Sequence, residues 1–411
     1  MSSTVIIGAG IIGCSTAFYL TEHEDVDATS IHLVESSPEF FASASGKSGG
    51  FLAEDWFSPP VAPLGELSFR LHKELADQND GRANWGYSLT TGTSYVEPVK
   101  VNTNPNGGDW LQEGRSRADV AGAHEFRNGD GPAWLARRHG DSVDTIGEQG
   151  SAAQVDPLRL SQFLLGKCRE RYVQIHQPAY VASIITDDEG KLTTVNIKYD
   201  AGEEVEVPCQ RLLITAGAWT GRVFKQLFPR SKKEIPVTRY AGHSLVLRSP
   251  RWSTADEAKG CHAVFSSMRT GFSPEVFSRI GGEIYIAGLN DGSLELPERA
   301  TDAKIDNASI AQLKEMSRKL LSSQQNPDDL EVIREGLCFR PVTRNGTPII
   351  SKIEERHLAG LQADSKNGGG VYVAAGHGPW GISLSLGTGK VMSEMLKGQK
   401  TSANVSRLAL R

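Results

Sequence analysis

The chain has 411 residues, of which 39% are hydrophobic and 23% are charged, and its formal net charge is −5 at pH 7. Domains typically hold about 100–200 residues, so this length predicts more than one domain in an ordinary globular protein. The negative charge and the lack of a lysine and arginine cluster argue against nucleic acid as a partner. No stretch approaches the roughly 20 apolar residues that span a bilayer, so we expect no integral membrane segment.

The five cysteines are scattered through the chain and form no CxxC pair. This pattern is typical of a reducing compartment and predicts neither a disulfide framework nor a zinc site. The apolar stretch Val5–Gly13 lacks the basic region of a signal peptide and has glycines at the spacing of a phosphate-binding loop. We therefore expect a cytoplasmic protein without a metal centre.

The first 35 residues predict a strand, a helix and a second strand, at 4–8, 11–22 and 31–35. Together these elements form a βαβ unit, the building block of dinucleotide-binding sheets. Residues 43–50 are a run of small side chains, which predicts a loop that cannot build a core of its own.

Beyond this unit, the residues at 66–78 predict an amphipathic helix. Residues 98–150 are rich in Gly, Asp, Asn and Arg, which predicts a long surface excursion and not a core segment. A helix and four strands follow, at 158–172, 173–184, 192–199, 204–207 and 211–215. The last strand runs into a glycine turn at 216–219 and so repeats the strand–turn–helix order of the N-terminus.

Residues 235–290 alternate apolar and polar side chains, which predicts an antiparallel sheet exposed on one face. A helix is predicted at 307–323. The strand 371–375 then leads through a glycine-rich turn into a helix at 385–397. This is the third strand–turn–helix junction of the chain.

The three junctions lie at both ends and in the middle of the chain, so we predict two interleaved domains. The first is a Rossmann-type α/β domain for a dinucleotide, made of residues 1–95, 150–230 and 335–411. The second is a substrate domain with an antiparallel sheet, an α+β arrangement made of residues 96–149 and 231–334.

Gly8, Gly10 and Gly13 make a GxGxxG motif between the first strand and its helix. The glycines permit a tight turn and a close approach of the pyrophosphate to the helix N-terminus, where unpaired N–H groups favour negative charge. Glu35 ends the second strand, where a carboxylate accepts both hydroxyls of an adenosine ribose and disfavours NADP. The motif alone leaves FAD and NAD open.

Further motifs stand in a fixed order along nearly the whole chain: Val5–Gly13, Glu35, Ala42–Ala53, Gln154–Pro157, Leu213–Trp219, Cys338–Ile350 and Ala375–Gly381. In this order the sequence resembles the D-amino-acid oxidase, glycine oxidase and sarcosine oxidase superfamily of FAD enzymes. Within the superfamily it resembles most a largely fungal subgroup of FAD-dependent oxidoreductases. The resemblance implies that the cofactor is FAD.

The resemblance also implies which parts of the cofactor each motif contacts. It places the backbone of Ile11 and Ile12 at the pyrophosphate, Gly49–Phe51 at the N5 and O4 edge of the flavin, and Val181 at the adenine. The turn 377–383 would hold the ribityl chain and the pyrimidine end. The full cofactor set that we predict is Gly8, Gly10, Ile11, Ile12, Gly13, Glu35, Ser36, Ala44, Ser45, Lys47, Gly49, Gly50, Phe51, Val181, Ala216, Gly217, Trp219, Cys338, His377, Gly378, Pro379, Trp380, Gly381, Ile382 and Ser383.

On the reacting side of the flavin, Arg340 matches the arginine by which glycine oxidase and its relatives hold the substrate carboxylate. A planar guanidinium grips a carboxylate with two parallel hydrogen bonds, although an ordinary structural arginine remains an alternative. The backbone carbonyl of Pro379 is expected to accept from the substrate amine, and Trp380, where the sequence departs from the covalent relatives, is expected to form a wall of the pocket. Hydride transfer in this family needs no strong enzymatic base.

Two other residues carry open alternatives. Cys338 matches the place where some relatives attach the flavin covalently, but a free cysteine is often only a small buried apolar residue. Lys47 either promotes reaction with oxygen near the flavin or pairs with a phosphate. Pro379 and Trp380 stand where the covalent relatives have a lysine, which puts a sarcosine-type carboxylate site in doubt.

We therefore predict an FAD-dependent oxidoreductase that oxidises a small amine or amino-acid-like substrate by hydride transfer to flavin N5, with oxygen as the acceptor. Two alternatives stay open. One is a dehydrogenase of the same fold that passes electrons to another acceptor. The other is a flavin-binding protein with an interaction role in intracellular trafficking, since a fold does not dictate a function.

Overall fold

The structure is a computed structural model of the whole chain. It describes residues 3–97, 127–128 (backbone only), 131–137, 140–147, 150–268, 272–322, 326, 328–362 and 368–411. Within this part no helix is both long enough and apolar enough to cross a membrane.

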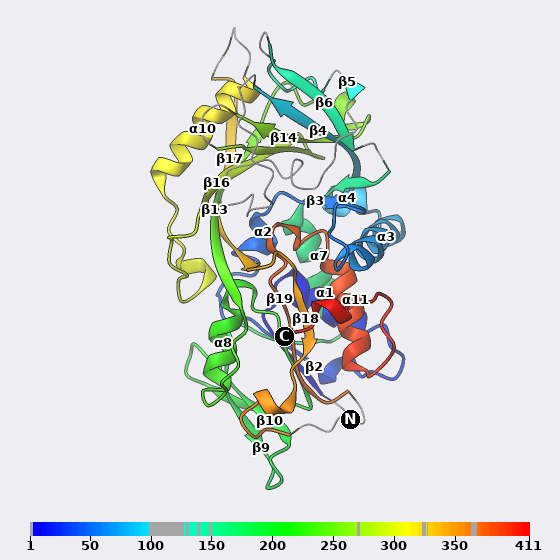
Figure 1. Cartoon of the computed structure of the whole chain (residues 1–411), viewed down its shortest axis with the longest axis vertical. Helices are drawn as coiled ribbons and strands as arrows, with labels where there is room; N and C mark the ends of the chain where they lie inside the picture. The colour runs from blue at the N-terminus through cyan, green and yellow to red at the C-terminus, as the bar shows by residue number, and fades with distance from the viewer. Residues whose placement is uncertain are drawn as a thin grey trace.

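A six-stranded sheet forms the centre of the molecule (Figure 1). Its strands lie in the order β18 (Ile349–Lys352), β19 (Gly370–Ala375), β12 (Arg211–Ile214), β1 (Thr4–Ile7), β2 (Ile31–Val34) and β8 (Gln174–His176). All neighbours are parallel except β18 and β19. Strands β1, β12 and β19 are buried throughout, as expected for a parallel sheet that is covered on both faces.

Alternate residues of this sheet face two different cores. Ile6, Leu33 and Leu213 pack into a core with four helices: α1 (Ile11–Leu20), α3 (Ala62–Gln78), α7 (Pro157–Glu170) and α11 (Ser385–Leu396). Their neighbours Val5, Val34 and Leu212 face the other core, under a small sheet of β9 (Ala179–Thr186), β10 (Leu192–Tyr199) and β11 (Glu204–Pro208) and helix α8 (Thr220–Leu227). Because successive residues of a strand point to opposite faces, one face of the sheet is covered by helices and the other by the small sheet together with α8.

A second, larger sheet lies at the other end of the molecule (Figure 1). Its strand order is β17 (Glu331–Thr343), β13 (Val237–Arg248), β16 (Glu283–Asp291), β15 (Glu275–Arg279), β14 (Cys261–Ser267), β4 (Ser88–Val96), β6 (Ser142–Gly147) and β5 (Arg127–Asn128). Strand β7 (Ala152–Gln154) pairs with β4 and with β3 (Phe51–Ala53). Helix α10 (Asn307–Leu321) packs on one face of the sheet.

Short helical segments complete the described elements: α2 (Ala44–Lys47), α4 (Gly81–Trp85), α9 (Thr254–Glu257), η1 (Ala28–Ser30), η2 (Gly217–Trp219), η3 (Ala300–Asp302), η4 (Glu355–His357), η6 (Gly378–Trp380) and η7 (Ser406–Leu408). Two of them, η2 and η6, occupy the second and third predicted glycine turns. The domain boundaries stay a prediction.

Three details differ from the sequence-based expectations. The loop at 43–50 contains the helical turn α2, because its small residues allow tight packing against α7. The segment at 98–150 is not only a surface excursion, since β6 joins the large sheet and Trp134, Leu135 and Val143 are buried in the core beside α10. Residues 98–126 lie outside the described part. The predicted antiparallel sheet contains one exception, because β14 pairs in parallel with β4.

Candidate functional site

The carboxyl ends of β1, β2, β12 and β19 meet at a cavity of about 600 Å³ between the two sheets. In open α/β sheets, ligands bind at this end of the strands, at a point where the strand order reverses. Here the order reverses at β1, which has β12 on one side and β2 on the other. The cavity is lined by the turns after all four strands and by residues of the large sheet.

Helix α1 begins at this cavity. Gly10 is its N-cap and has no side chain to cap the helix, so the N–H groups of the first turn are left to partners other than the N-cap residue. The Ile11 N–H donates to Ser45 Oγ at 2.9 Å, which places the serine hydroxyl at the same point. Gly13 does not line the cavity, but a Cβ there would lie 2.1 Å from the carbonyl oxygen of Gly8. Its role is to let the helix pack closely against the turn.

Glu35 lies at the end of β2, on the cavity wall. Its carboxylate accepts hydrogen bonds from the N–H of Ala9 at 3.1 Å and of Ser37 at 2.9 Å. Burial raises the pKa of Glu35, and the backbone hydrogen bonds oppose this increase. Val181 lines the cavity from β9, beyond Glu35. This end has the donors, the carboxylate and the apolar wall that an adenosine group needs.

The turn after β19 closes the cavity on another side. His377 is buried here, and its Nε2 lies 3.1 Å from Thr388 Oγ1. Burial lowers the pKa of His377 to about 4, so its ring is neutral at pH 7. Helix α11 follows at Ser385, and Ser383 Oγ accepts from the Ala53 N–H at 3.0 Å instead of facing the cavity. Stabilisation of a negative ligand by this turn must therefore come from backbone N–H groups.

Arg340 lies on β17 and lines the other end of the cavity. Its Nη1 donates to Asn290 Oδ1 at 2.6 Å, and the guanidinium lies against Gly242, where a Cβ would be 2.0 Å from Nη1. Burial lowers the pKa of Arg340, but Cys338, Tyr285 and other acidic groups nearby more than offset this and raise it. The arginine is a fixed cation whose orientation is set by its neighbours.

Cys338 precedes Arg340 by two residues on β17, lines the cavity and is 2% exposed. Lys47, the last residue of α2, lies beside Gly336 of the same strand but does not line the cavity. Burial lowers the pKa of the Lys47 amine, while Cys338 acts in the opposite direction. The structure therefore brings Lys47 and Cys338 together. It does not test whether Cys338 attaches the flavin, or whether Lys47 acts on oxygen or on a phosphate.

An aromatic cluster borders the cavity below the large sheet. Trp380 stacks edge-on against Phe57, with ring centroids 4.9 Å apart, and Trp56 lies 5.1 Å from Phe51 and 5.2 Å from Phe265. Phe51 lines the cavity directly, whereas Trp380 lies behind it. Aromatic side chains of this kind shape a pocket and exclude water from it.

Most of the predicted cofactor residues share this cavity wall: Gly8, Gly10, Ile11, Ile12, Glu35, Ser36, Ala44, Ser45, Gly49, Gly50, Phe51, Val181, Ala216, Gly217, Trp219, Cys338, His377, Gly378, Pro379, Gly381 and Ile382. Gly13, Lys47, Trp380 and Ser383 do not line it. The three glycine turns thus converge in space. Their roles toward a cofactor stay a proposal.

Sequence reasoning missed three residues near the reacting end. Glu275 on β15 lines the cavity, Asn290 on β16 holds Arg340, and Arg279 at the end of β15 contacts the loop before Phe51. None belongs to a motif. The only sequence signal was the alternation within 235–290, which places residues on a face but does not say what that face covers.

The family model described as "DAO: FAD dependent oxidoreductase" matches residues 3–395. The chain belongs to this family. It is thus an FAD-dependent oxidoreductase, and the helix N-terminus, the Glu35 carboxylate and the converging turns fit that cofactor.

Individual proteins are similar to this chain in sequence or in fold. A Schizosaccharomyces pombe protein, C1F5.03c, named as an oxidoreductase, is 29% identical over 433 residues, covering 98% of this chain and 96% of that protein. Two solved structures are similar with a TM-score of 0.71. Glycine oxidase from Geobacillus kaustophilus is 19% identical and covers 100% of this chain and 98% of its own. Iminodiacetate oxidase from Chelativorans sp. BNC1 is 18% identical, and the similarity covers 99% of this chain and 98% of that protein.

Proposed function

We propose that this enzyme oxidises a small amino acid or a related amine that carries a carboxylate, with oxygen as the electron acceptor. The observation that supports this most directly is the position of Arg340 on the cavity wall, with Asn290 fixing its guanidinium. A guanidinium held in this way binds a carboxylate with two parallel hydrogen bonds.

The charges at this end of the cavity also favour a substrate with both signs of charge. Glu275 lines the cavity, and its charge acts on Arg340. An arginine and a carboxylate that share one cavity match the carboxylate and the ammonium group of an amino acid. Phe277 and Tyr285 also line the cavity and stack on each other, with ring centroids 6.0 Å apart, so they add an aromatic wall beside these charges.

The glycine turns of the cavity would hold FAD, which when bound would supply the acceptor for a hydride from the substrate carbon next to nitrogen; the imine would then hydrolyse in water, and the two electrons would pass with two protons to oxygen, giving hydrogen peroxide. The protein contributes orientation to this reaction. Arg340 would fix the carboxylate and so direct the carbon–hydrogen bond, and the Pro379 carbonyl would accept from the amine. The aromatic cluster would keep bulk water away from the reacting atoms.

The similar proteins support the same substrate class. Glycine and iminodiacetate, the compounds in the names of the two oxidases, each combine an amine with a carboxylate. We infer that a carboxylate-bearing amine is also the substrate of this chain.

The experiment is anaerobic mixing of the yellow protein with a panel of amino acids, N-substituted amino acids and simple amines. The expected result is bleaching of the flavin band by carboxylate-bearing amines, followed by recolouring and hydrogen peroxide formation when oxygen is admitted. No bleaching with any compound would contradict the proposal. Bleaching without recolouring in oxygen would retain the substrate class and replace oxygen by another acceptor.

Arg340→Met tests whether Arg340 binds the carboxylate of the substrate. It should lower kcat/KM by about 100-fold, close to 2.7 kcal/mol, because a buried charged contact to the substrate is lost. Flavin content should not change. Arg334→Met, on the same strand but not on the cavity wall, is the matched control and should keep kcat/KM within about twofold. An unchanged kcat/KM in Arg340→Met would show that the arginine is only structural.

A further inference from the structure

Arg279 is a buried cation that no motif accounts for. It ends β15 in the large sheet, and its side chain is 1% exposed. Arginine is rarely buried to this extent unless it is paired. Burial lowers the pKa of Arg279, yet an arginine stays charged in a protein. Burying a charged guanidinium costs free energy, so we expect a polar contact of this group that offsets the cost.

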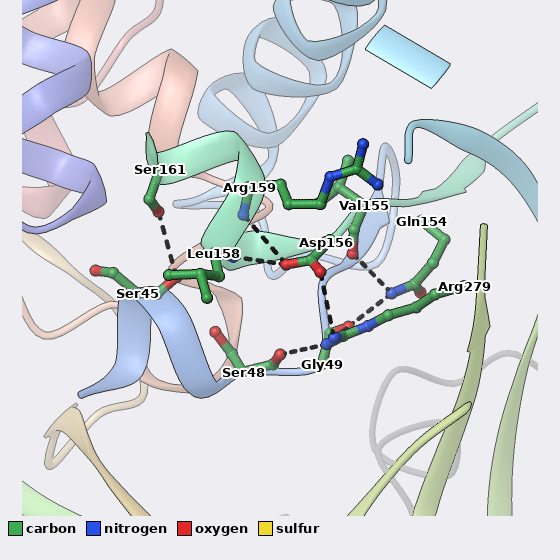
Figure 2. A network of polar contacts seen from close by, with 10 residues as sticks. All are labelled: Ser45, Ser48, Gly49, Gln154, Val155, Asp156, Leu158, Arg159, Ser161 and Arg279. Atoms are coloured by element: carbon green, nitrogen blue, oxygen red, sulfur yellow. Dashed lines mark hydrogen bonds and ion pairs between the residues drawn. The ribbon is translucent and has the colours of Figure 1, made fainter. Parts of the chain in front are cut away.

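The contact is made with the loop that precedes β3 (Figure 2). Arg279 Nη2 donates to the carbonyl oxygen of Ser48 at 2.7 Å and to that of Gly49 at 2.8 Å. Gln154 Nε2 also donates to the Gly49 carbonyl, at 2.6 Å. Two carbonyl groups of one short loop are therefore held by side chains from two different strands.

The ion pair of Arg279 is weak by comparison. Its Nη1 lies 4.0 Å from Asp156 Oδ2, and Asp156 Oδ1 already caps helix α7 through the N–H groups of Leu158 and Arg159 (Figure 2). Within the described residues, neither Nε nor Nη1 of Arg279 has a hydrogen-bond acceptor. The two loop carbonyls are thus the main polar partners of this side chain. Its position is set by the loop, not by the carboxylate.

Holding these carbonyls also fixes the N–H groups of the loop. In a trans peptide, the C=O of one residue and the N–H of the next point in opposite directions. Because the Ser48 and Gly49 carbonyls point toward Arg279, the N–H groups of Gly49 and Gly50 point away from it. Gly49 and Gly50 line the cavity, whereas Arg279 does not, so the side away from Arg279 is the cavity side.

The guanidinium has one further neighbour on the cavity wall. It lies over the ring of Tyr285, 5.0 Å from the ring centroid. Tyr285 lines the cavity and stacks on Phe277. Arg279 therefore connects the large sheet to the cofactor loop and to the roof of the reacting end at once.

We propose that Arg279 is a positioning residue for the flavin, which aims the N–H groups of Gly49 and Gly50 into the cavity where the flavin edge binds. The inference rests on the proposed place of the flavin beside this loop. It does not depend on the identity of the substrate, because the contact is between the protein and its cofactor.

The test is the affinity for FAD and the visible spectrum of the bound flavin in Arg279→Met, which removes both donors and keeps an apolar stem. FAD release is followed by flavin fluorescence over a dilution series of the holoprotein. We expect at least a tenfold increase in the Kd, because two charge-assisted hydrogen bonds that preorganise the loop are lost, and a shifted flavin band. Arg279→Lys, which retains a donor and the charge, should recover part of the affinity.

Arg251→Met is the matched control. Arg251 also binds a backbone carbonyl, that of Leu321, and the carboxylate of Asp329, but it lies away from the cavity. Its Kd for FAD should stay within twofold of the unsubstituted protein. A folded Arg279→Met with an unchanged Kd and spectrum overturns the inference. If Arg279→Met does not fold, an unchanged Kd in Arg279→Lys overturns it, and a Kd raised at least threefold with a shifted band supports it.

The failure of the proposed function would look different. If the unsubstituted protein binds FAD but none of the tested compounds bleaches the flavin, the proposed substrate class is wrong. The comparison of FAD affinities between the Arg279 variants is then still valid. If substrates bleach the flavin and Arg279→Met binds FAD normally, only the inference about Arg279 is wrong.

Discussion

The end of the cavity that we propose for adenosine, here the adenosine end, and the end that we propose for the substrate, the reacting end, are built in different ways. The first comes mainly from one stretch of about thirty residues, β1, α1 and β2, which offers backbone N–H groups together with one carboxylate, Glu35, and Val181 of β9 adds an apolar wall. The second is assembled from β15, β16, β17 and the turn after β19, and it offers side-chain charges. Changes at the adenosine end should therefore affect fold and cofactor together, whereas changes to Arg340 and its partner Asn290 at the reacting end should affect the substrate alone.

The largest effect should come from Gly13→Ala at the adenosine end. The new Cβ would lie 2.1 Å from a backbone oxygen, that of Gly8, which has little freedom to move. We expect a loss of about 1–3 kcal/mol in the free energy of unfolding, measured with urea, together with a lower flavin content.

Gly166→Ala is the control for this change, because Gly166 lies in helix α7 and a Cβ there would meet no atom of another described element within 4 Å. Alanine is favoured over glycine in a helix by up to about 1 kcal/mol, so stability should stay equal or rise. Equal losses in both variants would contradict the close-packing argument at Gly13.

A smaller and more selective effect is expected at the reacting end from Gly242→Ala. Its Cβ would collide with Nη1 of Arg340, the far end of a flexible side chain, so the guanidinium would move away from Asn290 while the fold survives. We expect KM to rise about tenfold, a change of 1.4 kcal/mol, with unchanged flavin spectrum and content. Asn290→Ala should act in the same direction, and a normal KM in both variants would show that the guanidinium needs no fixed orientation.

The effect that is smallest near neutral pH, and that grows only as the pH falls, should be a pH dependence of stability near the adenosine end. His32 Nδ1 lies 3.0 Å from His176 Nε2, and the carbonyl of His176 accepts from the Glu35 N–H. Burial, followed by the charge of His176, lowers the pKa of His32 to about 4. An unfolded histidine takes up a proton below about pH 6.5, so the unfolded state binds more protons and stability should fall from about pH 6.5 to about pH 4. His32→Gln should make this fall shallower in a thermal unfolding series, and an identical slope would contradict the assignment.

The same contrast explains how far the sequence could predict the site. Gly8, Gly10, Gly13 and Glu35 lie close together in sequence, and their spacing alone predicts a strand, a turn and a helix. The two other glycine turns were also found, because each follows an apolar strand. The convergence of all three on one cavity follows from parallel pairing, which puts the carboxyl ends of the strands at one edge.

Asn290 and Arg279 could not be found in this way. Their contacts depend on the register of β16 and β15 within the large sheet and on how this sheet lies over the loop at 48–50. Register is set by long-range pairing, which a pattern of alternating residues does not specify. Trp134 and Leu135 were missed for a related reason, since a glycine-rich composition conceals a few residues that reach the core.

Strand β17 carries Cys338 and Arg340 two residues apart, so both side chains stand on the same face. A displacement of the large sheet along this strand would move the two side chains by the same amount. The spacing between Cys338, where the cofactor would meet the protein, and Arg340, where a carboxylate would be held, is thus a property of one backbone segment. The backbone of β17 thus fixes the distance between these two side chains. A rocking motion between the two sheets would leave that distance unchanged, whereas a bend within β17 would alter it.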